Sequence, residues 1–468
     1  MMLNTEIIVW CLFSYVMTMS STQIIISLVT YRLIYRRRAM GRVEVAESML
    51  KAYEPPISIV IPAYNEEATI VTSIQSMLQL RYADYEVVVV NDGSKDGTLA
   101  QLIKAFDLIA FPQSYNVRLK VKPVLGVYYS PKIPKLRVID KVNGGKADGI
   151  NCGINAARHP LFCCVDADSI LDRDSLLRVV QPFMDDSSTV ASGGTVRIAN
   201  GCTVRDGLLL DARVPNDWLA RFQIVEYIRG FLFGRLGWAR YNGLLIISGA
   251  FGVMRRDTVI EVGGYRHQTI GEDMELIVRL HRVLSAKKRR YRIVYVPEPI
   301  CWTEAPEDFR TLKNQRVRWQ RGLCESLWLN RGLPFSWPPS VASALAFPYF
   351  VLFEWAAPLV EGFGYLFFAY LIIFHDVAAH MAILLLLVTI LFGIVLSTLS
   401  VLLDELCFHV YTRPRDIAMM LFIGVVENFG YRQLNVVWRL QGMWQWLRGK
   451  QGGWGVMQRK GIGTQVKK

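Results

Sequence analysis

The sequence predicts an α/β domain of the Rossmann-like kind, flanked on both sides by transmembrane helices. Three observations lead to this fold class. An almost uncharged stretch at 7–30 precedes the domain, short β-branched runs alternate with helical segments between about 55 and 330, and a second apolar region begins after Pro338. Strands that alternate with helices indicate a parallel sheet wound in right-handed βαβ units.

Composition supports a membrane protein. Apolar residues make up 52% of the chain, and yet its net charge is +13. This combination is typical of proteins whose cytoplasmic parts carry Lys and Arg. A nucleic-acid-binding protein is excluded because the basic residues cluster beside hydrophobic spans instead of on one polar module. The eight cysteines show no Cys-x-x-Cys motif and no regular spacing, so they indicate reduced thiols rather than a metal site or a disulfide framework.

The N-terminal region, 1–42, is expected to be a membrane anchor with a basic flank. Residues 7–30 are numerous enough for one transmembrane helix. No small-residue cleavage site follows, so a retained anchor is expected in place of a removable signal peptide. Five arginines come next: Arg32, Arg36, Arg37, Arg38 and Arg42. The positive-inside rule therefore places the N-terminus outside and the following domain in the cytoplasm.

Between 55 and 330 the pattern is that of a globular domain. Strands are expected at 57–61, 86–90, 137–140 and 161–165. Helices are expected at 68–80, after Asp96, and at 145–158. Residues 107–136 contain four prolines and are expected to form a looser stretch.

The C-terminal region, 341–468, is expected to hold transmembrane and interfacial helices and a basic cytoplasmic tail. Residues 341–374 are interrupted by two prolines and two glutamates, whereas 378–403 are a cleaner transmembrane segment. The segment 417–437 carries polar groups, so it either lies at the interface or faces a polar pathway. From Arg432 onward there are eight Lys or Arg residues and no acid. Two spans after the domain are therefore expected, in a multi-pass protein of the cell inner (plasma) membrane.

The clearest chemical signal is the run 161–168, in which an apolar strand ends in Asp166-Ala-Asp168. Two carboxylates one residue apart lie on the same side of the chain as it leaves the sheet. In open α/β sheets the ligand crevice lies beyond such strand ends, and hard cations such as Mg²⁺ prefer carboxylate and phosphate oxygens. On the tetrapeptide alone, an Asp-rich turn in which Asp168 or Ser169 caps a helix is the better interpretation.

Four further signals lie in the same domain. Pro62-Ala-Tyr-Asn-Glu-Glu and Asp92 follow the first two strands, where each is as readily a turn or a helix cap. Asn143-Gly-Gly-Lys opens a helix, and its glycines would let backbone N–H groups approach a phosphate; its spacing is not that of a Walker A loop. Gly271-Glu-Asp precedes an amphipathic stretch at 274–283, where compensation of the helix dipole is the plainer alternative.

Together these motifs resemble the processive family 2 glycosyltransferases, the membrane synthases of cellulose, chitin, hyaluronan and poly-N-acetylglucosamine. The resemblance covers residues 57–322. Its most specific element is 315–319, which reads Gln-Arg-Val-Arg-Trp and matches the Gln-x-x-Arg-Trp signature. The segment 248–252 is similar to the one that lines the acceptor site. The single-domain layout is most similar to that of the bacterial poly-N-acetylglucosamine type, and the resemblance implies a GT-A fold.

The resemblance implies a donor site for a UDP-sugar. Three residues after the first two strands would hold the uridine: Tyr64, Glu66 and Asp92. Lys146 and Asp166 would bind the diphosphate-sugar, and Asp168 would be the main ligand of Mg²⁺ or Mn²⁺. The metal would neutralise the leaving diphosphate as a Lewis acid.

On the acceptor side the resemblance implies that Asp273 is the general base, so that direct attack inverts the anomeric centre. The other residues implied on this side are Ser248, Gly249, Gln315, Arg316, Arg318 and Trp319. The two arginines would engage the diphosphate, and the indole would stack under an acceptor sugar. A core or membrane-interface aromatic is the alternative interpretation of Trp319.

The implied function is transfer of a sugar, expected to be N-acetylglucosamine, from its UDP donor to a growing β-linked polysaccharide that the protein also translocates. The expected partners are the donor, the polysaccharide, the lipid bilayer, and export or accessory proteins, without nucleic acid. Two alternatives remain. One is a glycosyltransferase that makes a single transfer to a lipid acceptor, which would need no Gln-x-x-Arg-Trp motif. The other is a catalytically inactive membrane scaffold.

Overall fold

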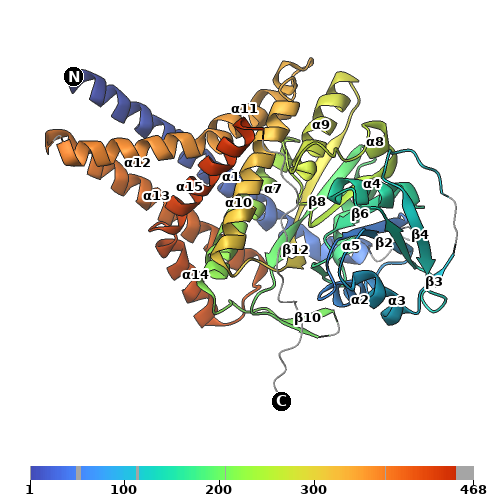
Figure 1. The fold of residues 1–468 in the computed structure, drawn as a ribbon. Helices are drawn as coiled ribbons and strands as arrows, with labels where there is room; N and C mark the ends of the chain where they lie inside the picture. The colour runs from blue at the N-terminus through green and yellow to red at the C-terminus, as the bar shows by residue number, and fades with distance from the viewer. Residues whose placement is uncertain (1, 49–53, 112–114, 206, 375, 450–468) are drawn as a thin grey trace.

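The computed structural model describes residues 2–48, 54–111, 115–205, 207–374 and 376–449. Figure 1 shows an α/β domain from which two groups of helices project: the N-terminal half of α1 (Met2–Ser48), and the pair α12 (Ala357–Phe374) and α13 (Asp376–Phe408). The helices of the domain are α2 (Ile70–Leu78), α3 (Thr98–Phe106), α4 (Lys146–Ala156), α5 (Ser175–Asp185), α6 (Trp218–Tyr227), α7 (Arg235–Arg240), α8 (Arg256–Glu261), α9 (Glu272–Ala286) and α10 (Phe309–Leu329).

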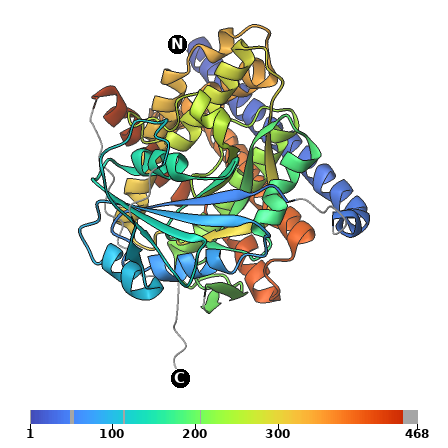
Figure 2. The same ribbon diagram turned by 90° about the vertical axis from the view of Figure 1, so that its right-hand side faces the viewer.

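Within the described residues, the domain is built on a ten-stranded mixed sheet in the order β3-β4-β5-β2-β1-β6-β11-β8-β12-β7. Its strands are β1 (Ile57–Ala63), β2 (Tyr85–Asp92), β3 (Ile109–Ala110), β4 (Val124–Tyr129), β5 (Leu136–Lys141), β6 (Leu161–Val165), β7 (Ile170–Leu171), β8 (Thr189–Ile198), β11 (Phe251–Arg255) and β12 (Arg292–Thr303). The short strands β9 (Thr203–Arg205) and β10 (Leu208–Asp211) pair with each other. Figure 2 views this sheet after a quarter turn.

The four strands predicted from the sequence are confirmed, and they form one parallel part of the sheet; β8 and β12 form another parallel pair. Strands β5, β2, β1 and β6 are adjacent and parallel, and their register aligns Ala63 with Asn91. Their carboxyl ends therefore meet at one edge, as the βαβ pattern predicted. The three predicted helices, at 68–80, after Asp96 and at 145–158, correspond to α2, α3 and α4.

The expectation of a wholly parallel sheet is wrong, as is that of a loose stretch at 107–136. Strand β11 is antiparallel to both β6 and β8. The 107–136 stretch contributes β3 and β4, and β4 pairs antiparallel with β5. Its prolines flank β4 without interrupting it, and the strand itself is rich in β-branched and aromatic residues.

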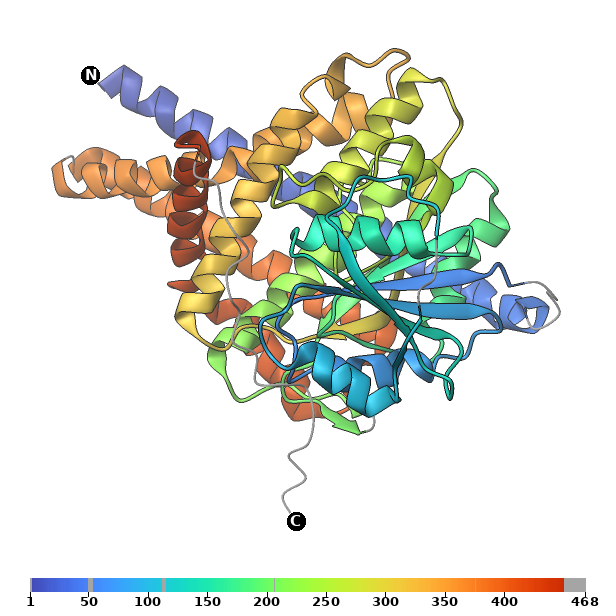
Figure 3. The ribbon, with the colours of Figure 1, turned by 45° about the vertical axis from the view of Figure 1, so that its right-hand side comes forward.

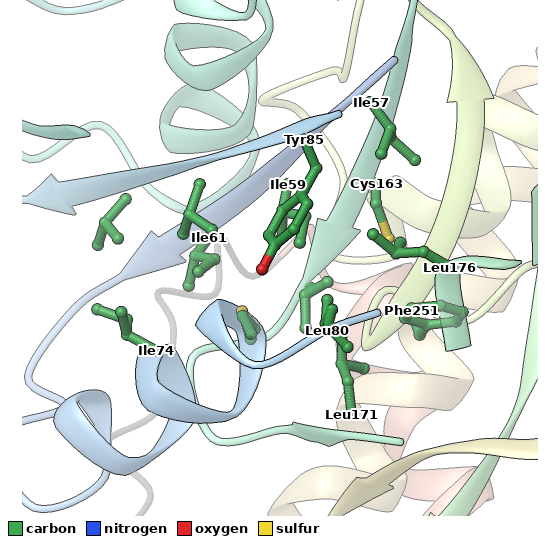
Figure 4. Close-up of a cluster of buried hydrophobic side chains, with 14 of the residues drawn as sticks. Ile57, Ile59, Ile61, Ile74, Leu80, Tyr85, Cys163, Leu171, Leu176 and Phe251 are labelled. Carbon is green, nitrogen blue, oxygen red and sulfur yellow. The ribbon is translucent and has the colours of Figure 1, made fainter. Parts of the chain in front are cut away.

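Two hydrophobic cores sandwich the sheet. Ile57, Ile59 and Ile61 face the core formed with α2, α3 and α5, which Figure 4 shows, while Val60 faces the core formed with α4 and α9. All four side chains are fully buried. Because alternate residues of a strand point to opposite faces, a strand covered by helices on both sides must be apolar throughout.

Among the residues that the structure describes, three helices are long and apolar enough to cross a membrane. The spans are Glu6–Arg36 in α1; Ala342–Phe374, which comprises η3 (Ala342–Ala346), α11 (Phe347–Tyr349), η4 (Phe350–Trp355) and α12; and Ile383–Phe408 in α13. Two of them follow the domain, as predicted. The segment 417–437 is divided between α14 (Pro414–Val426) and α15 (Tyr431–Leu447), because Gly430 between them has a φ of +98°. The expected basic tail beyond 449 lies outside the described residues.

Candidate active site

A cavity of about 600 Å³ begins at the carboxyl end of β6 and continues between the helices that follow the domain. Ten of the thirteen predicted site residues line it: Lys146, Asp166, Asp168, Ser248, Gly249, Asp273, Gln315, Arg316, Arg318 and Trp319. Residues far apart in the sequence thus meet in one space, and Figure 3 shows α10 and α15 passing beside the domain there. Tyr64, Glu66 and Asp92 do not line it.

Asp166 and Asp168 lie where the sequence predicted, directly after β6. Lys146 Nζ is 2.5 Å from Asp166 Oδ1, and Thr303 Oγ1 donates to Asp168 Oδ2 at 3.3 Å. The alternative that Asp168 or Ser169 caps a helix is wrong, because the next helix, α5, begins only at Ser175. Both carboxylates therefore face the cavity.

Lys146 is the first residue of α4 and follows Gly145, whose φ of +89° favours glycine. Burial lowers the pKa of Lys146, but the carboxylates of Asp166 and Glu272 outweigh burial and raise that pKa above the ordinary lysine value. The side chain is thus a permanent positive charge on the wall of the cavity. Such a charge is suited to a phosphate group.

Asp92 has a different position from the one expected. Its Oδ1 accepts hydrogen bonds from Lys141 Nζ at 2.6 Å and from Gly144 N at 2.9 Å, and its Oδ2 accepts one from Gly145 N at 2.7 Å. The side chain is 2% exposed. Asp92 therefore holds the glycine loop that precedes Lys146 and does not face the cavity. Glu66 likewise accepts a hydrogen bond from Thr69, one turn along the chain.

Asp273 lies close to Lys146 on the wall of the cavity, in the first turn of α9. Its Oδ2 accepts a hydrogen bond from Gly249 N at 3.0 Å, and its Oδ1 accepts one from Met274 N at 2.8 Å. A Cβ at Gly249 would lie 3.1 Å from Lys146 Nζ. Glycine at this position therefore lets the predicted base and the predicted phosphate-binding lysine approach the same point.

The pKa of Glu272, the residue next to the predicted base, is shifted by its surroundings. Burial and the negative charge of Asp273 raise the pKa of Glu272, and Lys146, 3.9 Å from Glu272 Oε1, opposes them. The alternative that Glu272 only compensates the helix dipole does not account for this burial. The charges of Lys146, Asp166, Glu272 and Asp273 form one interacting cluster.

The segment 315–319 lies on α10 and faces the cavity, with Trp319 38% exposed. The Arg316 guanidinium, however, is bound by the protein: Nη2 lies 2.7 Å from Glu226 Oε2, and Nη1 donates to Gln315 Oε1 at 2.9 Å. The expectation that Arg316 engages a diphosphate is therefore not supported by its contacts. Arg318 remains the arginine that we expect to bind the diphosphate.

Several charged residues of the cavity wall were not found from the sequence. They come from α6, η1 (Ile228–Gly234), α7, η4, α12 and α15: Glu226, Arg229, Arg235, Glu354, Glu361 and Arg439. The π-helical η1 is itself a signal, because π-helical turns often occur at functional sites. In the sequence, the available signal is the placement of Arg229 and Arg235 among glycine and apolar residues at 228–237.

The donor set fits a hard divalent cation. Among the described residues, no group of three or more His, Cys, Asp or Glu side chains could hold a metal ion alone. Asp166 and Asp168 instead offer carboxylate oxygens next to a lysine suited to phosphate. Mg²⁺ and Mn²⁺ accept such oxygens and are commonly bound by one or two carboxylates together with substrate phosphates.

Two family models match the chain. The model described as "Glycosyl transferase family 2" matches residues 58–263, and the one described as "Glycosyl transferase family group 2" matches residues 161–396, which is half of the chain. Together they cover the sheet that carries the candidate site and the cavity-lining helices from α6 to the first part of α13, whereas α1 and α15, which also line the cavity, lie outside the matched residues.

Curated relatives include two proteins named poly-beta-1,6-N-acetyl-D-glucosamine synthase. The one from Staphylococcus aureus is 28% identical over 266 residues, which cover 57% of this chain and 54% of that protein. The one from Staphylococcus epidermidis is 27% identical over 304 residues, which cover 65% of this chain and 61% of that protein. The chain thus spans less than two thirds of the length of these relatives.

Among solved structures, the mannosyltransferase PcManGT from Pyrobaculum calidifontis in complex with GDP-Man and Mn²⁺ has a TM-score of 0.54 to this chain. The two are 15% identical, and the match covers 94% of this chain and 100% of the other. At this identity the match shows a shared fold.

Proposed function

Because the chain belongs to glycosyl transferase family 2, we propose that it is a membrane-embedded inverting glycosyltransferase. It transfers a sugar, N-acetylglucosamine in our proposal, from a UDP donor to a growing β-linked polysaccharide. One observation carries the proposal. A single cavity joins Lys146, Asp166 and Asp168 to Asp273 and Trp319, and it continues among the membrane helices.

The donor side binds a diphosphate-sugar. Lys146 and Arg318 supply positive charge for the two phosphates, and Asp168 with Asp166 supplies oxygen ligands for Mg²⁺ or Mn²⁺. When bound, the cation neutralises the leaving diphosphate as a Lewis acid. Tyr64, Glu66 and Asp92 lie at the same edge of the sheet, where the uridine would bind, and Asp92 acts there through the glycine loop.

Proton transfer is assigned to Asp273. Its Oδ2 takes the proton of the acceptor hydroxyl while that oxygen forms a bond to the anomeric carbon and the bond to the UDP oxygen breaks. The backbone N–H of Gly249 holds this carboxylate in place. Attack from the side opposite the leaving diphosphate inverts the anomeric centre, so an α-linked donor gives a β-linked product.

The acceptor path leads toward the membrane. Trp319 and Tyr227 have ring centroids 6.2 Å apart and offer aromatic surface for a sugar. Farther along, Glu354 and Glu361 line the cavity beside Tyr349 and Phe353, and carboxylates of this kind accept hydrogen bonds from sugar hydroxyls. This continuity supports processive synthesis with translocation through the helices.

The proposal has a topological part. Residues 1–42 form the anchor, 55–330 the cytoplasmic catalytic domain, and 341–468 the C-terminal membrane region. The three candidate spans and the arginines that follow the first one support a multi-pass protein of the cell inner membrane with its N-terminus outside. Export or accessory proteins would be required only to receive the product.

One assay tests the proposal against both alternatives. Purified protein in detergent receives radiolabelled UDP-N-acetylglucosamine or UDP-glucose with Mg²⁺ or Mn²⁺, and the products are sized. A ladder or a high polymer supports the synthase. A lone lipid-soluble product would identify the single-transfer enzyme, and absence of turnover with every donor, also after addition of membrane lipids, would identify the scaffold. Omission of the metal and the Asp168→Ala variant are the controls, and both should abolish activity.

A further inference from the structure

The indole of Trp319 is covered on one side by a protein cation. The guanidinium carbon of Arg316 lies 4.3 Å from the centroid of the indole ring, which is the geometry of a cation–π contact. Trp319 is nevertheless 38% exposed and lines the cavity. A stacked guanidinium restricts the orientation of the ring while another part of its surface stays available to a ligand.

Arg316 is in turn held in place from outside α10. Its Nη2 lies 2.7 Å from Oε2 of Glu226, a residue of α6 that is 90 positions away in the sequence. The Arg316 side chain is 3% exposed. Burial lowers the pKa of Arg316, but the Glu226 carboxylate together with two neighbouring tyrosines raises it overall, so the guanidinium stays charged.

Glu226 has a second partner that fixes its position. The hydroxyl of Tyr431, at the start of α15, donates to the same Oε2 at 2.8 Å. The Tyr431 ring is stacked on Phe222, one turn before Glu226 on α6, with centroids 4.7 Å apart. The chain of contacts Tyr431–Glu226–Arg316–Trp319 therefore joins three helices and ends at the cavity.

We propose that Glu226 is a positioning residue that acts through Arg316 to hold Trp319 in the orientation that stacks against the acceptor sugar. The inference rests on the proposed function, since it assigns an acceptor to Trp319. Arg316 occupies the first x position of the Gln-x-x-Arg-Trp signature. The inference gives it a role distinct from that of Arg318. Donor binding is not expected to depend on this chain of contacts, because Lys146 opens α4 and Asp168 follows β6, outside the three helices that the contacts join.

The test compares two fates of the cleaved donor: polymer and free sugar released by hydrolysis. In Glu226→Ala the ratio of free sugar to polymer should rise roughly 10-fold, the size expected when a stacking contact of about 1.4 kcal/mol is lost. KM for the UDP-sugar should stay within 2-fold of wild type. Glu226→Gln keeps an oxygen acceptor for Tyr431 and Arg316, so it should restore most of the wild-type ratio.

A double-mutant comparison separates positioning from direct contact. In a Trp319→Ala background, the further change Glu226→Ala should leave the ratio unchanged within 2-fold, because the residue through which Glu226 acts is gone. Tyr431→Phe should raise the ratio modestly. Its control is Tyr411→Phe, which removes a buried hydroxyl without a hydrogen-bond partner among the described residues and should have no effect.

The outcomes also separate this inference from the proposed function. Wild-type protein that consumes no sugar nucleotide would contradict the function itself. Wild-type protein that polymerises, together with a Glu226→Ala variant of unchanged ratio, would overturn only the inference. Two further outcomes would overturn the inference as well. One is a 10-fold effect of Glu226→Ala that persists in the Trp319→Ala background. The other is an equal loss of hydrolysis and polymer formation in Glu226→Ala that Glu226→Gln does not restore.

Discussion

At the scale of single residues, Gly249 lies close to both the predicted phosphate-binding lysine and the predicted base. A Cβ there would lie 3.1 Å from Lys146 Nζ and 3.5 Å from Asp273 Oδ2. We expect Gly249→Ala to reduce turnover about 10- to 100-fold, because the Lys146 ammonium would have to shift by a fraction of an ångström, and small misplacements of such groups are costly for catalysis. Turnover is measured as UDP released. Gly332→Ala is the matched control, because a Cβ there meets nothing within 4 Å; equal turnover of the two variants would contradict the proposal.

The proposed base gives a second prediction. Asp273→Asn keeps an oxygen that can accept the hydrogen bond from Gly249 but removes the capacity to take a proton. We expect a loss of at least about 100-fold in polymer formation, with UDP affinity within 2-fold of wild type by calorimetry. If this variant polymerised at the wild-type rate, proton removal would have to be reassigned.

His281 has no proposed catalytic role, and it allows a test of how the stability of the fold depends on pH. It is fully buried, and its ring nitrogens contact the Tyr291 hydroxyl and the Leu244 carbonyl at 2.8 Å. Burial lowers its pKa from 6.5 to about 4. The unfolded chain therefore binds a proton first as the pH falls, and stability that is complete above pH 6.5 is lost between pH 6.5 and 4.

The measurement is the thermal midpoint of wild type and His281→Gln in detergent at pH 7.5 and pH 5. The variant should be less stable than wild type at pH 7.5, and this deficit should shrink at pH 5, because glutamine does not titrate. A deficit that is the same at both pH values would contradict the buried neutral histidine. Turnover per folded molecule should be unchanged in the variant.

Residues found from the sequence and residues missed differ in what brings them together. Lys146 opens a helix and Asp168 follows a strand, so the direction of the parallel strands was enough to place them at one edge, whereas Asp273 was found through the resemblance of its motif. Glu226 was missed because its partners are 90 and 205 positions away on helices whose packing no local pattern specifies. Asp92 was placed at the correct edge, but its hydrogen bonds to the glycine loop depend on a turn that the sequence does not define.

At the scale of elements, the π-helical η1 shapes the proposed polymer path. Gly230 and Gly234 both line the cavity, and a Cβ at either glycine would meet no atom within 4 Å. These glycines therefore leave width in the cavity and are not there to avoid a clash. Strand β4, which lies between β3 and β5, illustrates the opposite limit of sequence reasoning. Its pairing with β5 depends on a neighbour, and the surrounding prolines obscured it.

We expect Gly230→Leu to shorten the product chains several-fold, because its side chain enters the path of the polymer while the donor side is untouched. The measurement is the size distribution of radiolabelled product at equal UDP release. Gly332→Leu is the control, since its side chain would also enter open space but outside the cavity lining. Product of wild-type length from Gly230→Leu would show that the polymer leaves by another route.

At the scale of the whole molecule, the proposed catalysis and translocation require the sheet and the candidate membrane helices to keep their relative positions. A buried ion pair links them. Arg197 on β8 binds Asp404 on α13 through two hydrogen bonds, from Nη1 to Oδ2 at 2.8 Å and from Nη2 to Oδ1 at 2.5 Å. The side chains are 4% and 2% exposed. The two-pronged geometry fixes orientation as well as distance, and Val196, next to Arg197, lines the cavity.

Asp404→Ala should therefore destabilise the protein by about 3–5 kcal/mol, since it leaves the Arg197 guanidinium buried without its counter-charge. The measurement is thermal unfolding in detergent, with Asp211→Ala as the control. Asp211 pairs with Arg213 at 2.7 Å and with Arg413 at 3.2 Å, but the three side chains are 32%, 44% and 50% exposed, so the loss should be at most about 1 kcal/mol. Similar midpoints for the two variants would contradict a buried link between the domain and its membrane helices.

A double variant Arg197→Met/Asp404→Leu removes both charges and should recover much of the stability, because packed apolar side chains can replace a buried ion pair. If positioning of the sheet depends on the ion pair itself, this stable double variant will still make shorter product than wild type.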